Sequence, residues 1–315
     1  MTKDINRVRG AMYGVAVGDA LGAPLEFMDA SSIQRQHGTV RDMIGGGWLN
    51  VYPGEITDDT QMTLCVAHGI VSDPDDPVPC VGKNFLRWTA SRPKDIGATC
   101  ASAISYCARH ITGRSRTPDA DAWRAAALAT HNASGGRSAG NGSLMRTVYA
   151  GLYYDNAETV LEKAVQISEM THHDPLAAEA CAAYSEAVYS LVRENDADER
   201  WLVMCDVIEF VAGNRYDFSI LSSDLFMPHP SGYVVDSFSA ALHCICTTSS
   251  FEEAVVKAVN LGGDADTIGA ITGGLAGALY GYEAIPKRWT TLLSQKLCED
   301  IELLSFEAVN NNRHE

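Results

Sequence analysis

The segment from Leu261 to Gly281, "LGGDADTIGAITGGLAGALYG", decides how this chain of 315 residues folds. Its apolar residues recur at the three- and four-residue spacing of a helix. Asp264, Asp266 and Thr267 stand together at its head, and almost no polar side chain follows them. The segment therefore predicts a buried helix that begins with two carboxylates and a hydroxyl.

Glycine recurs at every fourth position of this segment and of a second one near the N-terminus. The two rows are Gly269, Gly273, Gly277 and Gly281, and Gly10, Gly14, Gly18 and Gly22. A glycine inside a helix costs about 1 kcal/mol relative to alanine, so such rows need a compensating gain. Residues four apart share a helix face, and a face without side chains lets another backbone approach closely. We expect both helices at the centre of the fold, packed on each other or on neighbours; simple burial in the core is the alternative.

Alanine-rich segments with helical spacing continue through the chain, whereas the alternating runs typical of strands are scarce. The expected helical segments are 5–22, 60–71, 95–111, 120–130, 143–154, 156–170, 175–194, 198–213, 234–247, 251–260, 267–281 and 286–308. Breaks rich in turn residues fall at 72–82, 112–122, 193–200 and 214–232, and none is long enough for a domain linker. The sequence predicts an all-α fold and a single compact domain spanning 1–315.

A second acidic cluster, "TDDT", precedes another apolar helix and holds Thr57, Asp58, Asp59 and Thr60. Helix capping is the simpler interpretation of each cluster, because Asp and Thr are preferred at helix N-termini and acids suit the positive end of the helix dipole. Capping needs only one such residue, however, and here two acids with flanking threonine appear twice.

Buried carboxylates need a cation nearby, because an unpaired buried ion costs several kcal/mol. Four carboxylates with hydroxyls, and without a His or Cys beside them, form a hard all-oxygen set. Such a set favours Mg²⁺ or Mn²⁺, with Ca²⁺ as an alternative, over zinc. Two clusters brought together would hold two ions and leave positions open for water and substrate.

A glycine-rich loop, "SGGRSAGNGSLMR" at residues 134–146, runs into a predicted helix. Consecutive backbone N–H groups and a helix start suit a phosphate or pyrophosphate, although the loop lacks the ending of a Walker motif. An ordinary flexible loop is the alternative. Taken alone, His172 in "THHDP" is typical of a cap or surface residue, and Tyr233 in "GYVVDS" is typical of a core residue.

The formal net charge of −16 comes from scattered acids, and no basic block or stripe is present. This pattern argues against nucleic acid as a direct partner. The N-terminus lacks the apolar run of a signal peptide, and no window approaches the roughly 18 apolar residues of a membrane span. The cysteines are dispersed without a CxxC pair, as expected in a reducing compartment. We expect a cytoplasmic monomer without a membrane partner.

Six motifs, taken together, resemble the ADP-ribosylglycohydrolase family, the group that includes dinitrogenase reductase-activating glycohydrolase. They are "GVAVGDALGAPLEF" (14–27), "ITDDTQM" (56–62), "GNGSLMR" (140–146), "THHDP" (171–175), "GYVVDS" (232–237) and the segment 261–281. They follow the family order and cover nearly the whole chain. TDDT and GGDADTIGA are highly specific as a pair.

The resemblance implies an all-α fold around a binuclear Mg²⁺ or Mn²⁺ centre that removes ADP-ribose from modified side chains. The residues it assigns to the metals are Thr57, Asp58, Asp59, Asp264, Asp266 and Thr267. The residues it assigns to the substrate are Ser138, Ala139, Gly140, Asn141, Gly142, His172 and Tyr233. Glu26 matches a carboxylate that some members place beside the metals on a mobile loop, as a gate or an auxiliary catalytic group.

The reaction that this resemblance implies is hydrolysis of the bond between ribose C1″ and a side chain of an ADP-ribosylated protein. We expect Asp59, Asp266 and Glu26 to be catalytic, with Asp59 or Glu26 as the proton acceptor. Arginine-linked ADP-ribose is the expected substrate. A serine linkage, O-acetyl-ADP-ribose and ADP-ribosylated nucleic acid remain open, and so does a non-catalytic, crystallin-like binding or structural role, although all six metal positions are intact.

Overall fold

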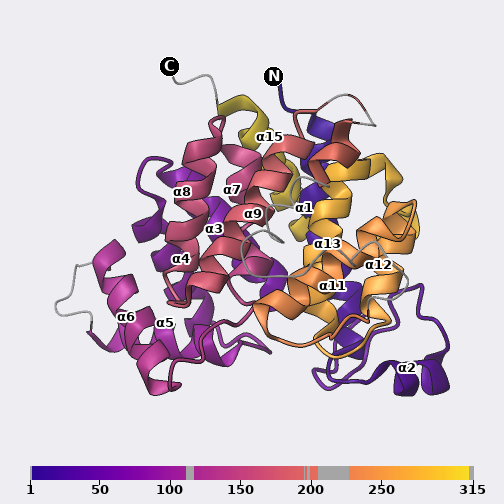
Figure 1. Cartoon of the computed structure of the whole chain (residues 1–315), viewed down its shortest axis with the longest axis horizontal. Helices are drawn as coiled ribbons and strands as arrows, with labels where there is room; N and C mark the ends of the chain where they lie inside the picture. The colour runs from indigo at the N-terminus through magenta and orange to yellow at the C-terminus, as the bar shows by residue number, and fades with distance from the viewer. Residues whose placement is uncertain (1, 111–116, 195, 197–198, 205–226, 312–315) are drawn as a thin grey trace.

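Two glycine-rich helices, α1 (Ile5–Gly22) and α13 (Ala265–Tyr280), lie against each other in the middle of the protein (Figure 1). The computed structural model describes residues 2–110, 117–194, 196, 199–204 and 227–311. The two helices run antiparallel, and their glycines meet in pairs: Gly10 with Gly277, Gly14 with Gly273, Gly18 with Gly269, and Gly22 with Ala265. The expectation that the two rows pack on each other is confirmed.

The contact between α1 and α13 is backbone against backbone. A methyl group added at Gly14 would lie 2.6 Å from the carbonyl carbon of Gly273, and one added at Gly273 would lie 2.7 Å from that of Gly14. Both distances are far below the van der Waals separation of carbon atoms, about 3.5–4.0 Å. Only glycine fits here, so close packing along this seam offsets the low helix propensity of the two rows.

The other helices are arranged on both sides of this central pair. Helices α11 and α12 contact α13, α3 packs on α4, and α9 packs on α7 and α8. Helices α5 and α6 form a pair at one edge, and α2 lies at the opposite edge (Figure 1). Their bounds are α2 Ala30–His37, α3 Asp58–Ser72, α4 Pro77–Ala90, α5 Ala98–His110, α6 Ala120–Ala133, α7 Val148–Tyr153, α8 Ala157–Ser168, α9 Pro175–Leu191, α11 Val234–Cys246, α12 Phe251–Val259, α14 Lys287–Thr290 and α15 Gln295–Asn310.

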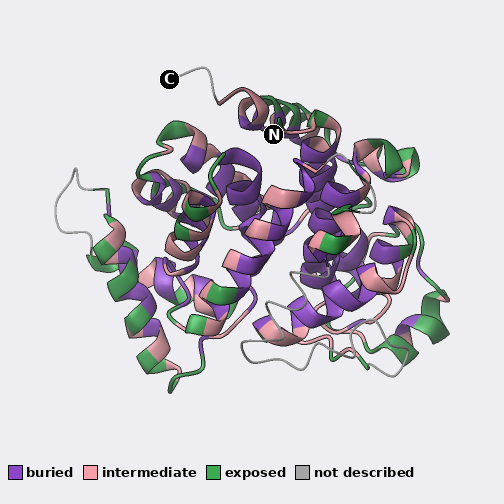
Figure 2. Cartoon of the chain, turned by 45° about the horizontal axis from the view of Figure 1, so that its top comes forward, coloured by how far each residue is buried: buried purple, intermediate pink, exposed green. Residues whose placement is uncertain are grey.

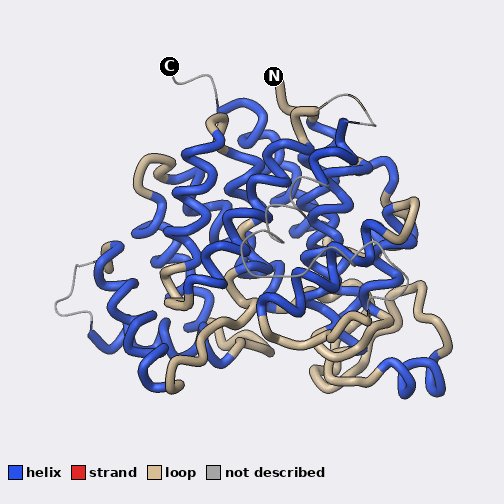
Figure 3. The backbone as a smooth tube through the Cα atoms, in the orientation of Figure 1, coloured by secondary structure: helices blue, strands red, loops and turns tan. Residues whose placement is uncertain are grey.

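The predicted all-α class is confirmed, because the described residues form helices and loops with no strand (Figure 3). Buried residues run through the centre of the bundle, and exposed ones gather on α2, α6 and α15 (Figure 2). The described helices form one compact unit; its extension over all of 1–315 stays a prediction. The described cysteines are free thiols. No described helix combines the length and the apolar character that a membrane crossing requires.

Some predicted boundaries were wrong for identifiable reasons. Helix α4 was missed, because no helix was predicted between 60–71 and 95–111. It begins at Pro77, inside the predicted break 72–82, since proline is well tolerated in the first turn of a helix, where its missing N–H is not needed. The segment 286–308 is divided into α14 and α15, and 143–154 into a 3₁₀ turn, Leu144–Arg146, and α7. Helix α2 was not predicted. Of the predicted helix 198–213, residues 199–204 are helical and the rest lies outside the described residues.

Candidate active site

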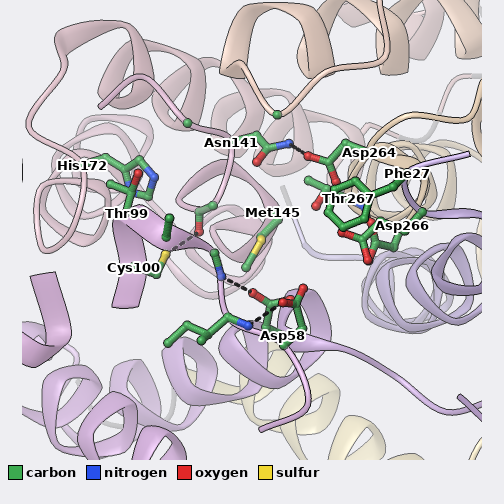
Figure 4. A pocket seen from close by; sticks show the side chains of 18 of the residues that line it. Phe27, Asp58, Thr99, Cys100, Asn141, Met145, His172, Asp264, Asp266 and Thr267 are labelled. Carbon is green, nitrogen blue, oxygen red and sulfur yellow. Dashed lines mark hydrogen bonds between the residues drawn. The ribbon is translucent and has the colours of Figure 1, made fainter. Parts of the chain in front are cut away.

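The starts of α3 and α13 meet at a cavity of about 320 Å³ (Figure 4). Three loops complete its wall, at residues 26–27, 95–97 and 140–142. Carboxylates dominate the polar part of the wall, and no described lysine or arginine lines it. The five acidic residues that line the cavity are Glu26, Asp58, Asp95, Asp264 and Asp266. Five carboxyl groups therefore crowd the wall of one cavity.

The acids at the head of α13 converge with Glu26. One carboxylate oxygen each from Glu26, Asp264 and Asp266 lies within 4.8 Å of the others, as in a site that could hold a cation. Asp264 occupies the N-cap position of α13, yet its side chain makes no capping hydrogen bond. It accepts one instead from the Asn141 amide, at 2.8 Å, and that amide also reaches Ser237. Capping does not explain this carboxylate.

Asp19 of α1 holds the TDDT cluster in place through hydrogen bonds. Thr57 is the N-cap residue of α3, but its hydroxyl does not cap the helix. The backbone N–H of Thr57 donates to Asp19 at 3.0 Å, and its hydroxyl donates at 2.9 Å. Thr60 donates to Asp19 through the same two groups. Asp19 thus fixes the first turn of α3 and leaves the two following acids free for another task.

Those two acids have different surroundings. Asp58 lines the cavity and accepts a hydrogen bond from the Gly97 backbone N–H at 3.2 Å. Asp59 is only 1% exposed, and its Oδ1 has no hydrogen-bond partner among the described residues. A buried carboxylate oxygen without a partner is rare, because leaving it unsatisfied costs the desolvation energy of the group.

Burial and mutual repulsion make the ionised state of this cluster unfavourable. Burial raises the pKa of Glu26 to about 7 and that of Asp58 to about 8, and nearby carboxylates add to both shifts. Burial, followed by the charges of neighbouring acids, raises the pKa of Asp59 and Asp266 well above the usual range. Hard divalent cations would remove this penalty, and the all-oxygen donor set with the unpartnered Asp59 oxygen fits them.

The predicted substrate residues divide into two groups. Gly140, Asn141, Gly142 and His172 line the cavity, whereas Ser138, Ala139 and Tyr233 do not. The loop is fixed by pairing with the segment before α11, since the Asn141 N–H donates to Gly232 and the Val234 N–H donates to Ala139. Ser138 is buried, and its hydroxyl lies 2.7 Å from Nδ1 of His131.

His172 is buried behind this loop. Its Nδ1 lies 2.8 Å from the Thr171 hydroxyl, and its Nε2 is directed toward Gly140. Burial, with a smaller contribution from the Arg146 charge, lowers the pKa of His172 to about 3. His172 is therefore neutral at physiological pH and can take part in the cavity only as a neutral hydrogen-bonding ring.

Arg146 is a cation that lies behind the cavity wall, next to Gly142 and Thr171. It is fully buried, and its guanidinium donates to the carbonyl oxygens of Gly142 and Ile167 and to the Thr171 hydroxyl. No described carboxylate pairs with it in a salt bridge, which is unusual for a buried charge. Its positive charge lies where an anionic diphosphate at the loop would benefit.

Several cavity residues were not predicted from the sequence. They are Phe27, Trp48, Asp95, Ile96, Gly97, Ala98, Thr99, Cys100, Met145 and Gly232, together with Asp19 and Arg146 behind the wall. Asp19 had a visible signal, because it is the one carboxylate within the glycine row of 10–22. Asp95 follows the polar stretch "SRPK" and had no visible signal in the sequence, because only the tertiary fold brings it close to the other acids.

Asp19→Ala should lower the free energy of unfolding by about 2–4 kcal/mol in excess Mn²⁺, because buried donors of Thr57 and Thr60 lose their acceptor. Urea denaturation measures this change. Asp19→Asn keeps one acceptor oxygen in place, so its loss should be smaller. A loss below about 0.5 kcal/mol for the alanine variant would mean that the donors find other partners and that Asp19 is not the support of the TDDT turn.

Several known proteins are similar to this chain in sequence over most of their length. The chain is 34% identical over 298 residues to ADP-ribosyl-[dinitrogen reductase] glycohydrolase of Rhodospirillum rubrum, covering 94% of this chain and 93% of the relative. It is 28% identical to ADP-ribosylarginine hydrolase Tri1 of Serratia proteamaculans, over 94% of this chain and 77% of the relative. ADP-ribosylhydrolase ARH3 of Bos taurus is 24% identical, over 95% and 90%.

A solved structure, described as an ADP-ribosylglycohydrolase-related protein complex, superposes with a TM-score of 0.76 at 31% identity. The superposition covers 97% of each chain. The family model for ADP-ribosylglycohydrolase matches residues 1–313. The protein belongs to the ADP-ribosylglycohydrolase family.

Proposed function

We propose that this protein is a metal-dependent hydrolase that removes ADP-ribose from modified arginine side chains of proteins. The observation that carries the proposal is the meeting of two acid clusters at one end of a cavity whose wall continues along the Gly140–Gly142 loop to His172. The printed names of relatives support it, since one acts on ADP-ribosyl-dinitrogen reductase and another on ADP-ribosylarginine.

The residues that would hold two Mg²⁺ or Mn²⁺ ions are Thr57, Asp58, Asp59, Asp264, Asp266 and Thr267, and Glu26 would lie beside the ions. When bound, the ions neutralise the acids and act as Lewis acids toward sugar hydroxyls and water. The Asn141 amide orients Asp264 for this task by a hydrogen bond. Asn141 would therefore support a metal ligand in addition to its predicted contact with the substrate.

The proton acceptor is better assigned to Glu26 than to Asp59. Glu26 lines the cavity, whereas Asp59 lies behind the wall and is almost fully buried. In the reaction a water oxygen forms a bond to C1″, the bond from C1″ to the guanidino nitrogen breaks, and Glu26 accepts the water proton. The leaving nitrogen then takes up that proton. Asp95, at the same side of the cavity, is a second acid close enough to serve.

The rest of the ADP-ribose would lie along the loop. The backbone N–H groups of Gly140 and Gly142 and the charge of Arg146 behind them suit the diphosphate, and neutral His172 adds a hydrogen-bonding ring. The partner is then an ADP-ribosylated protein whose modified side chain enters from the cavity mouth. The cytoplasmic location, the monomeric state and the lack of nucleic-acid or membrane partners stay predictions.

Release of ADP-ribose from matched arginine-linked and serine-linked peptides tests the proposal. We expect cleavage of the arginine conjugate with Mg²⁺ or Mn²⁺ and none in excess EDTA, because the acids cannot position the ribose without the ions. Cleavage that survives EDTA would remove the metal role. Cleavage of the serine conjugate alone would change the substrate, and binding of metal without any cleavage would favour another ADP-ribose conjugate or a binding role.

A further inference from the structure

Two large aromatic side chains stand exposed at the acidic end of the cavity. Phe27 is 71% exposed and Trp48 is 53% exposed, and both line the cavity. Their ring centroids are 5.4 Å apart with an interplanar angle of 42°. Aromatic side chains usually bury most of their surface, so a pair left open beside a cavity is a candidate contact surface for a ligand.

The backbone conformation of Phe27 is strained. Its φ of 63° lies in the left-handed region, which costs a non-glycine residue roughly 1–2 kcal/mol. Two hydrogen bonds hold it there: the Phe27 N–H donates to the Gly263 carbonyl at 2.7 Å, and the Gly263 N–H donates to the Met28 carbonyl at 2.7 Å. Gly263 directly precedes Asp264, so the backbone that carries Phe27 is fixed relative to the acid cluster. Strain of this kind is often found at functional sites.

Trp48 is fixed by its polar edge and keeps its faces open. Its indole N–H donates to Oε2 of Glu26 at 2.5 Å. Its loop is closed by a reciprocal pair of backbone hydrogen bonds between Gly46 and Val51, at 2.7 and 2.9 Å. The indole is therefore oriented by the carboxylate that borders the reaction centre.

The order of residues along the cavity shows what would meet these rings. In Figure 4, His172, Thr99 and Cys100 lie at one end, Asn141 and Met145 lie in the middle, and Phe27 lies beside Asp264, Asp266 and Thr267 at the other end. A substrate with its diphosphate at the loop and its proximal ribose at the acids would direct the group attached to C1″ toward Phe27 and Trp48. Asp95 also lines the cavity, is not among the proposed metal ligands and favours a cation there.

We propose that Phe27 and Trp48 form an aromatic platform that receives the guanidinium of the target arginine and selects cationic leaving groups. This inference rests on the proposed function. A guanidinium is planar and weakly hydrated, and it stacks on aromatic faces with both cation–π and dispersion attraction. A serine-linked sugar presents no planar cation to the two rings, so the platform would not help it.

Phe27→Leu tests the platform, because leucine keeps the apolar bulk and loses the aromatic face. With Mn²⁺ present, kcat/KM for the arginine-linked peptide should fall about tenfold, as expected for a lost cation–π contact beside buried acids. Phe27→Tyr, which keeps the face, should stay within about twofold of the wild type. The affinity for free ADP-ribose, measured by calorimetry, should be unchanged in both variants, since free ADP-ribose does not reach the rings.

Tyr52→Leu is the matched control, because Tyr52 is an exposed aromatic residue nearby that does not line the cavity. Equal loss in the Phe27→Leu and Phe27→Tyr variants, or kcat/KM unaltered by Phe27→Leu in an active enzyme, would overturn the platform and leave the proposed function intact. Weakened ADP-ribose binding in Phe27→Leu would also overturn the platform, because Phe27 would then support the whole site rather than receive the leaving group. A wild-type enzyme that cleaves no arginine conjugate would remove the proposed function itself.

Discussion

Gly273→Ala should prevent the protein from folding. The added methyl group would meet the backbone of Gly14, and neither side of the contact has a side chain that can rotate away. Overpacking of a core usually costs about 1–3 kcal/mol, and it costs more when nothing can relax. Here α1 and α13 would have to separate along the whole seam. We expect the free energy of unfolding to fall by more than about 5 kcal/mol, which is comparable with the entire stability of an ordinary domain.

The measurement is the yield of soluble protein together with thermal unfolding followed by circular dichroism. Gly97→Ala is the matched control, because a methyl group at Gly97 would meet no atom within 4 Å. It should fold and melt like the wild type. A Gly273→Ala variant that melts within about 5 °C of the wild type would contradict the close backbone contact.

Asp266→Asn should abolish turnover while leaving the fold intact. Asp266 is buried between other carboxylates that raise its pKa, and it belongs to the group of donors with Glu26 and Asp264. Losing metal-assisted chemistry removes several kcal/mol of transition-state stabilisation, so we expect a fall in kcat on the order of a thousandfold or more. Asp59→Asn should behave in the same way.

The same variants separate a catalytic from a structural role of the acids. In EDTA, Asp266→Asn should be as stable as the wild type or more stable, because the amide replaces a buried carboxyl group whose ionised form is unfavourable among the other acids. Mn²⁺ should raise the melting temperature of the wild type and not that of the variant. Asp121→Asn, at a carboxylate that is 92% exposed, is the control. A variant that is destabilised in EDTA would show that Asp266 supports the fold itself.

The central helix pair could be predicted because its cause is local. A glycine at every fourth position has no role in an isolated helix, so the spacing itself indicates a close partner. The two acid clusters were equally visible, because carboxylates before an apolar helix must be compensated. Capping, the simpler interpretation, fails because neither Thr57 nor Asp264 uses its side chain to cap its own helix.

The remainder of the site arises only when distant segments meet. Trp48 and Asp95 belong to loops that carry no periodic pattern, and nothing in their neighbourhoods indicates the acids that they face. Asn141 was predicted from its motif as a substrate contact, yet its amide holds Asp264, which is 123 residues away in the sequence. Glu26 was expected as a gate or an auxiliary group, and its place among the donor oxygens depends on the bend of the chain after α1.

The pairing of α1 with α13 also sets the order in which this protein can be made. Residues 5–22 leave the ribosome first, whereas residues 265–280 follow only after most of the chain has been synthesised. Until then the glycine face of α1 has no partner, and contacts between such distant segments form slowly. The nascent chain must therefore keep an apolar N-terminal helix from aggregating for most of translation.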